Sequence, residues 1–169
     1  LILDGPDRGQ VCDSADVDRL LDEETLLWAH VDAHHPDVDA FLDRHLPHVD
    51  DITHEALSAE DTRPRCVAIE DGALIMLRGV NLHEGAVPED MISVRLWVDP
   101  RRVVSLRRRD LRAISDLQAS VMTGQGPDAP GAFLAELACL LTDRMEPIFD
   151  ALEDAVAEQE QEVLDAPGP

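Results

Sequence analysis

The period of the apolar positions changes along the first third of the chain, which predicts strands mixed with helices. An almost continuous apolar run over residues 26–31 has strand length and predicts a strand that is covered on both faces. Apolar residues then recur at helical spacing between Pro36, which suits a first helical turn, and Pro47, which ends the helix. A second short helix is expected over residues 52–57. Together these elements indicate a sheet with helices packed on it.

The middle of the chain carries a strong hairpin signal. Apolar runs over residues 66–69 and 73–80 flank Asp71 and Gly72. An Asp-Gly pair between two apolar runs is typical of a tight turn between antiparallel strands, because its residues tolerate a positive φ. We therefore expect an antiparallel pair of strands here, with Asp71 and Gly72 as the turn.

A second hairpin is expected directly afterwards. Residues 91–98 alternate between apolar and polar positions, as a strand does, and a turn at Asp99 and Pro100 leads into a second strand over residues 103–107. An amphipathic helical pattern follows this hairpin. Asp110 stands just before that pattern, so we expect its side chain to cap the helix.

The C-terminal part of the chain has one long helical pattern over residues 133–165. Pro147 lies inside it, where a missing backbone N–H should kink the helix without necessarily ending it. The order of elements predicts an α/β (α+β) layer structure with a long C-terminal helix. The chain then divides into an α/β body over residues 1–131, a kinked helix packed on it over 132–165, and a helix-breaking end over 166–169.

Composition narrows the classes of partner. The 169 residues fit one domain, and 36 Asp and Glu against 14 Lys and Arg give a formal charge of −22, which repels nucleic acid. The three cysteines are far apart, as expected in a reducing cytoplasm. No apolar stretch approaches the roughly 20 residues of a membrane span, and no signal peptide is recognisable.

The sequence contains no motif that carries covalent chemistry. The glycines at 124 and 126 follow no strand and precede no phosphate-binding lysine, which excludes a nucleotide-binding loop of the usual kind. No serine lies in a Gly-x-Ser-x-Gly turn. We therefore expect that the protein is not an enzyme, with a hydrolase that uses the histidine-rich segment as a distant alternative.

Histidines and aspartates gather in one segment. Five of the seven histidines lie between positions 30 and 48, interleaved with aspartates, and imidazole with carboxylate suits zinc and similar divalent cations. The candidate ligands for a weakly bound divalent cation, zinc or magnesium, are His30, Asp32, His34 and His35. The alternative is structural: His30 is a hydrogen-bonded strand residue, and the others, with His45 and His48, are exposed.

Basic residues are also unevenly spread. All 14 are arginine, and six of them lie within twelve positions, where they could receive the acidic face of the last helix of a neighbouring subunit. These candidate interface residues are Arg101, Arg102, Arg107, Arg108, Arg109 and Arg112. The alternative is that they are solvated and paired within the monomer. The acidic helix face itself could attract divalent cations or be simply solvated.

An ordered series of segments resembles the cytoplasmic N-terminal domain of the CorA-like metal ion transporters, most closely the ZntB zinc transporter branch. The series spans most of residues 20–165. None of its members is a chemical motif alone, but their order is specific. The segments are Trp-Ala-His-Val-Asp at 28–32, Glu-Asp-Thr-Arg-Pro-Arg-Cys at 60–66, Leu-Arg-Gly-Val-Asn-Leu at 77–82, Pro-Glu-Asp-Met-Ile-Ser-Val-Arg-Leu-Trp at 88–97 and Asp-Arg-Met-Glu-Pro at 143–147.

The resemblance implies a mixed β-sheet sandwiched between helices, forming one wall of a funnel-shaped homopentamer at the cytoplasmic face of the membrane. It also implies a stalk helix, two membrane helices and a Gly-Met-Asn signature, none of which occurs in these 169 residues. Membrane contact is then expected only through segments outside this chain. The implied function is a cytosolic regulatory and assembly domain of a divalent metal cation transporter. The alternative is an oligomerisation scaffold without useful metal binding.

Overall fold

Five strands form a single mixed sheet in the computed structural model, which describes residues 1–60, 63–87 and 89–165. The strand order is β1-β5-β4-β3-β2, with β1 parallel to β5 and the other neighbours antiparallel. The strands are β1 (Leu27–Asp32), β2 (Arg65–Ile69), β3 (Gly72–Gly79), β4 (Ile92–Val98) and β5 (Arg102–Arg107). Both hairpins predicted from the sequence are present, and β1 occupies the sheet edge opposite β2.

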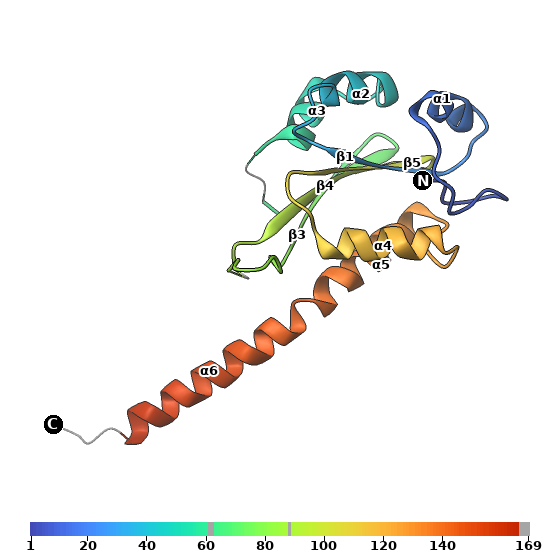
Figure 1. The fold of residues 1–169 in the computed structure, drawn as a ribbon. Coiled ribbons are helices and arrows are strands. Elements are labelled where there is room, and N and C mark those ends of the chain that lie inside the picture. Colours follow the sequence, from blue (N-terminus) through green and yellow to red (C-terminus); the bar gives the residue numbers. More distant parts are fainter. Residues whose placement is uncertain (61–62, 88, 166–169) are drawn as a thin grey trace.

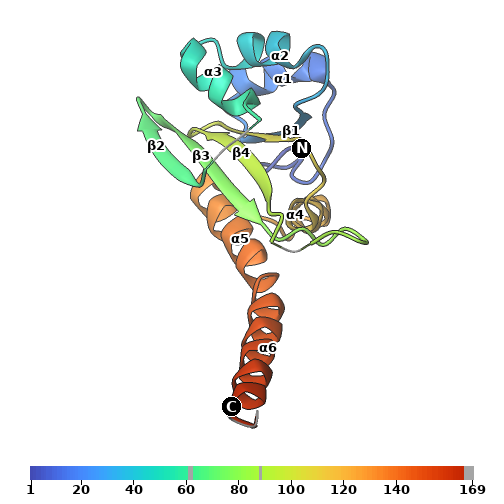
Figure 2. The ribbon, with the colours of Figure 1, turned by 90° about the vertical axis from the view of Figure 1, so that its left-hand side faces the viewer.

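Helices cover both faces of this sheet, as Figures 1 and 2 show. Three helices lie on one face: α1 (Ser14–Asp22), α2 (Val38–His45) and α3 (Asp51–Ser58). Two lie on the other: α4 (Arg112–Met122) and α5 (Pro130–Asp143). The predicted α/β fold with a sheet between helices is therefore confirmed.

Each face of the sheet has its own hydrophobic core, because side chains of a strand alternate between its two sides. On the α4–α5 face, Trp28 of β1 packs edge-on against Phe133 of α5, with ring centroids 4.9 Å apart. On the α2–α3 face, Trp97 of β4 packs among residues such as Leu42 and Leu57. Because helices cover both faces of the sheet, β1 and β4 are apolar at most positions.

The β2–β3 hairpin closes one residue earlier than the sequence predicts. Ile69 pairs with Gly72, so the two loop residues are Glu70 and Asp71, and Glu70 has the positive φ of 52°. Gly72 lies in the strand instead. A Cβ at Gly72 would overlap the indole ring of Trp97 on the neighbouring strand β4, which explains the glycine at this position by close approach and not by turn geometry.

Gly72→Ala should destabilise the fold by about 1–3 kcal/mol, because the added methyl must displace a buried indole. Chemical denaturation followed by circular dichroism measures the change. Gly131→Ala is the matched control, since a Cβ there meets nothing within 4 Å. Equal stability of the two variants would contradict the assignment of Gly72 to close packing.

The start of α4 differs from the predicted one. Its N-cap residue is Leu111, and no side chain caps it, whereas Asp110 forms an ion pair with Arg107. The backbone carbonyl of Asp110 also accepts a hydrogen bond from His83 Nε2 at 2.9 Å. Asp110 therefore fixes the connection between β5 and α4 and does not cap the helix. At the other end, Gly124 follows the helix with a φ of 75°, as a C-terminal glycine should.

The single kinked helix predicted over residues 133–165 is two helices. The first, α5, ends at Asp143, and α6 (Glu146–Asp165) begins after a turn at Arg144 and Met145. Pro147 is the second residue of α6, where the N–H that proline lacks would have no partner within the helix. Only α5 packs on the sheet, and α6 extends away from the body (Figure 1). The predicted chain end over 166–169 lies outside the described residues.

Candidate functional site

His30 is the most enclosed of the four predicted metal ligands. Its Nδ1 lies 2.8 Å from Ser105 Oγ on the neighbouring strand β5, and the same hydroxyl oxygen accepts a hydrogen bond from Trp28 Nε1 at 2.8 Å. Burial, and then the positive charge of Arg107, lower the pKa of His30 to about 4. His30 is therefore a neutral, hydrogen-bonded strand residue at pH 7.

This lowered pKa predicts a pH dependence of folding. The unfolded chain protonates His30 near pH 6.5, whereas the folded chain resists protonation down to about pH 4. Stability should therefore fall between pH 6.5 and 4, by up to about 1.4 kcal/mol per pH unit from this residue. Burial also lowers the pKa of His45, which contributes with the same sign. Denaturation of the wild type and of His30→Gln across this pH range measures the contribution of His30. If the free energy of unfolding changes equally with pH in the two proteins, the prediction is wrong.

The other predicted ligands lie beyond the end of β1. His34 lies 3.2 Å from Asp32 through Nδ1 and 3.5 Å from Arg108 through Nε2, so it sits between a carboxylate and a guanidinium. His35 faces Asp37 instead, at 3.9 Å. Within residues 1–60, 63–87 and 89–165, no group of three or more His, Cys, Asp or Glu side chains is arranged to hold a metal ion. The structure thus joins Asp32 with His34 only, and the four-residue metal site stays a prediction.

The predicted arginine interface is divided between the two ends of β5. Arg101 and Arg102 lie at the start of that strand, and Arg107 lies at its other end, about 17 Å away by strand geometry. Arg101 donates to the carbonyl of Leu21, and Arg102 forms an ion pair with Asp99 at 2.9 Å. These arginines at the start of β5 are held within the monomer.

The arginines after β5 also have partners, with one exception. Arg108 lies 3.3 Å from Glu60, and Arg109 lies 3.1 Å from Asp90. Arg112 is exposed, and no ion pair involves it in the part of the chain that the structure describes. The six residues consequently do not form one continuous patch, and their role at a subunit interface stays a prediction.

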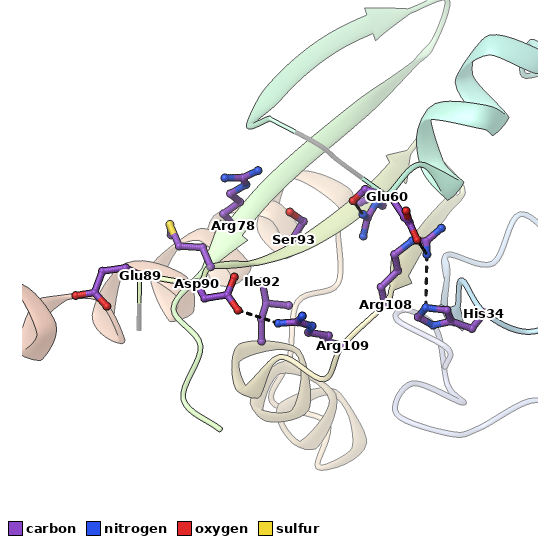
Figure 3. Close-up of a pocket in the computed structure, with 11 residues that line it drawn as sticks. His34, Glu60, Arg78, Glu89, Asp90, Ile92, Ser93, Arg108 and Arg109 are labelled. Atoms are coloured by element: carbon purple, nitrogen blue, oxygen red, sulfur yellow. Dashed lines mark hydrogen bonds and ion pairs between the residues drawn. The ribbon is translucent and has the colours of Figure 1, made fainter. Parts of the chain in front are cut away.

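Two of these arginines, Arg108 and Arg109, line a cleft of about 480 Å³ together with Arg78 and Arg95, and we call it the arginine cleft (Figure 3). It opens at the end of the sheet where β3 and β5 finish and β4 begins. Three carboxylates and a hydroxyl accompany the arginines. The residues with charged or polar side chains that line it are Arg78, Arg95, Arg108, Arg109, His34, Glu60, Glu89, Asp90 and Ser93.

Arg95 is the least expected member of this cleft. Alternation placed it on the polar face of its strand, yet it is only 2% exposed. Its guanidinium donates to the backbone carbonyls of Ala59 and Glu60 at 2.7 and 2.8 Å. Burial, and then the charge of Arg108, lower the pKa of Arg95. Sequence alternation gave no sign of this burial, because it cannot show that α3 covers the second face of β4.

His45 is a second residue that sequence reasoning misplaced. His45 was expected to be exposed at a helix end, but its side chain is only 5% exposed. Its Nδ1 lies 3.2 Å from a carboxylate oxygen of Asp18 in α1. Burial outweighs that carboxylate and lowers the pKa of His45. The residue therefore links α1 to α2 and is unavailable as a surface ligand.

The helix α6 presents a different kind of surface. None of its residues is buried, and most of its large apolar side chains are about half exposed or more, including Phe149, Leu152 and Val156. Where its first turns meet Val80 and Met91 of the body, they leave an apolar groove of about 490 Å³. Eight carboxylates and no basic residue lie along the helix. Among the described residues, no helix is both long enough and apolar enough to cross a membrane.

Comparison with known proteins places this fold in a family. A family model described as "CorA-like Mg2+ transporter protein" matches residues 23–168, which is most of the chain. The chain belongs to the CorA-like family. The resemblance inferred from the sequence is thereby confirmed, and membership of a family of transport proteins agrees with the expectation that the chain is not an enzyme.

Two relatives show which members it is similar to. The divalent cation transporter CmaX of Pseudomonas aeruginosa is 40% identical over 136 residues, covering 80% of this chain and 40% of the relative. The zinc transport protein ZntB of Klebsiella pneumoniae is 34% identical over 164 residues, covering 97% and 49%. The chain thus spans no more than half of the length of either relative.

Solved structures agree with these relatives. The structure of full-length CmaX matches with a TM-score of 0.75 and 34% identity, over 98% of this chain and 48% of that one. The crystal structure of the ZntB cytoplasmic domain from Vibrio parahaemolyticus matches with a TM-score of 0.71 and 29% identity, over 78% and 53%. The body and its C-terminal helices therefore correspond to a fold already seen in this family.

Proposed function

We propose that this chain is the cytoplasmic domain of a divalent metal cation transporter, of zinc or magnesium type, and that it regulates and assembles the pore. The observation that carries the proposal is the similarity to CmaX and to the ZntB cytoplasmic domain over most of the chain. The domain would lie at the cytoplasmic face of the inner membrane. It would reach the membrane only through segments beyond this chain.

The proposal assigns assembly to the surfaces that the monomer leaves uncovered. The apolar side chains along α6 need a partner, and in a homo-oligomer, a pentamer by resemblance to the family, a neighbouring subunit supplies it. Arg112 is available to pair with an acidic neighbour, whereas the arginines at the start of β5 are already engaged. Assembly without useful metal binding remains the second candidate, because the described residues form no preassembled metal group.

Regulation would follow from charge. A formal charge of −22 makes the domain repel itself, and divalent cations between acidic faces would relieve that repulsion. If one packing of the subunits binds cations more tightly, cation occupancy shifts the equilibrium toward it. Asp32 with His34, together with the carboxylates of α6, are the groups that would contribute ligands across a boundary.

Reconstitution tests the proposed transport. The full-length protein in liposomes should carry zinc or magnesium across the bilayer, detected by a fluorescent indicator inside the vesicles. This 169-residue chain alone should carry none. A full-length protein that moves neither cation would overturn the transport proposal.

Neutralising acids on α6 should weaken cation-dependent stabilisation. We expect the triple variant Glu153→Gln, Glu158→Gln, Glu160→Gln to lose at least half of the rise in melting temperature that millimolar magnesium or zinc gives the wild type. The matched control removes three exposed acids from the body, Asp22→Asn, Asp39→Asn and Glu55→Gln. The same loss in both variants would assign the effect to net charge and contradict a role for α6.

A further inference from the structure

The arginine cleft concentrates positive charge in a strongly acidic protein. The whole chain has 36 acidic and 14 basic residues, yet the described residues that line the cleft include four arginines and three acids. The cleft lies beyond the carboxyl ends of the parallel strands β1 and β5, beside the antiparallel strand β4. That edge of a mixed sheet is where α/β folds commonly bind ligands.

Within the residues that the structure describes, Arg95 gives the cleft a buried donor without an anionic partner. It is 2% exposed, its hydrogen bonds reach only the carbonyls of Ala59 and Glu60, and its Nε has no hydrogen-bond partner among the described residues. A buried guanidinium is costly unless a carboxylate or another anion balances its charge. The nearby guanidinium of Arg108 repels the positive charge of Arg95 and does not balance it.

The acids in the cleft hold their arginines loosely. Glu60 is 83% exposed beside Arg108, and Asp90 is 68% exposed beside Arg109, so solvent screens both ion pairs. Such exposed ion pairs contribute little to stability. A ligand with several anionic oxygens can displace both carboxylates at small cost and gain bidentate contacts with the guanidinium groups.

We propose that the arginine cleft binds a phosphate-type oxyanion, with Arg95, Arg108 and Arg109 as the recognising donors. Arginine suits this ligand because its planar guanidinium matches two oxygens at once. The volume of about 480 Å³ exceeds that of inorganic phosphate, so the cleft has room for a small molecule that carries the phosphate. Ser93 offers a hydroxyl at the same edge. The inference is independent of cation transport.

Calorimetric titration of the 169-residue chain tests this site, with inorganic phosphate and adenosine triphosphate as separate probes in metal-free buffer at fixed ionic strength. We expect saturable binding of at least one probe. Phosphate alone would indicate the free ion, and stronger binding of the nucleotide would indicate a phosphorylated small molecule. Arg108→Gln and Arg109→Gln should each weaken binding about tenfold.

Arg112→Gln is the control, because it removes the same charge from an exposed position outside the cleft and should change affinity less than twofold. Melting temperatures without ligand establish that each variant is folded. If Arg108→Gln perturbs the fold, Arg109→Gln decides, because the Arg109 side chain is exposed and forms its ion pair with the exposed Asp90. No saturable binding of either probe, or equal weakening by Arg109→Gln and Arg112→Gln, would overturn the proposal.

Discussion

Asp99→Ala should cost about 3–5 kcal/mol of folding stability, the largest loss that we expect from one substitution in this chain. The Asp99 side chain is buried at the turn between β4 and β5. It accepts hydrogen bonds from Trp97 Nε1 at 3.0 Å and from the backbone N–H groups of Arg101 and Arg102 at 2.9 and 3.0 Å. It also forms the ion pair with Arg102.

Removing this carboxylate leaves a buried indole N–H without its acceptor and a largely buried guanidinium without its anionic partner. A buried polar group that loses its partner costs more free energy than the hydrogen bond contributed when formed. Urea denaturation measures the loss. Asp99→Asn keeps one acceptor oxygen and should fall between the wild type and the alanine variant. Asp71→Ala, at the exposed tip of the neighbouring hairpin, serves as control. A loss at Asp99 no larger than at Asp71 would contradict this account.

Local patterns were sufficient for most elements of the fold. Alternation over residues 91–98 predicted β4, and the apolar run over 26–31 predicted β1 within one residue at each end. These patterns are informative because helices cover these strands, and side chains buried beneath a helix are mostly apolar. The hairpin predicted at Asp71 and Gly72 is present, but its turn lies one residue earlier. Gly72 belongs to the strand, where the lack of a Cβ leaves room for the Trp97 ring of β4.

Features that depend on distant segments were beyond the sequence. Nothing in β1 indicates that it pairs in parallel with β5, about 75 residues later. The break between α5 and α6 was missed because apolar spacing continues through Met145, although the backbone turns there and Pro147 opens a new helix. Periodicity reports which face is apolar and not whether the backbone is continuous.

The candidate sites show the same limit. The sequence identified His30 and Asp32 on one side of a strand, but His30 turns to Ser105, a residue that only the sheet register brings near. It grouped the six arginines by position, and β5 separates them. The arginine cleft, by contrast, assembles residues from β3, β4 and the segment after β5, so no local pattern could indicate it.

The apolar seam of α6 is the feature that most directly links structure to assembly. Phe149, Leu152 and Val156 follow one another at steps of three and four, which is the spacing of helices that pack side by side. Phe149 and Leu152 are each 56% exposed, and Val156 is 48% exposed. The first half of the 20-residue helix α6 therefore offers an apolar edge that stays about half exposed in the monomer.

The triple variant Phe149→Ser, Leu152→Ser, Val156→Ser should abolish self-association of the chain over the range in which the wild type assembles. Burying each of these side chains contributes about 1.5–3 kcal/mol, so losing three should weaken association at least about a hundredfold. Light scattering across a concentration series at low and moderate salt measures it. The monomer itself should remain folded, because none of the three belongs to a core of the body.

The control must remove exposed apolar surface without touching this seam. Val11→Ser with Ile52→Ser does so, since both side chains are exposed on the body, at 70% and 79%. If the seam mediates assembly, the control variant associates like the wild type and the triple variant does not. A wild-type chain that stays monomeric at every concentration, or a control that dissociates equally, would mean that α6 is covered by something other than a second copy of this chain.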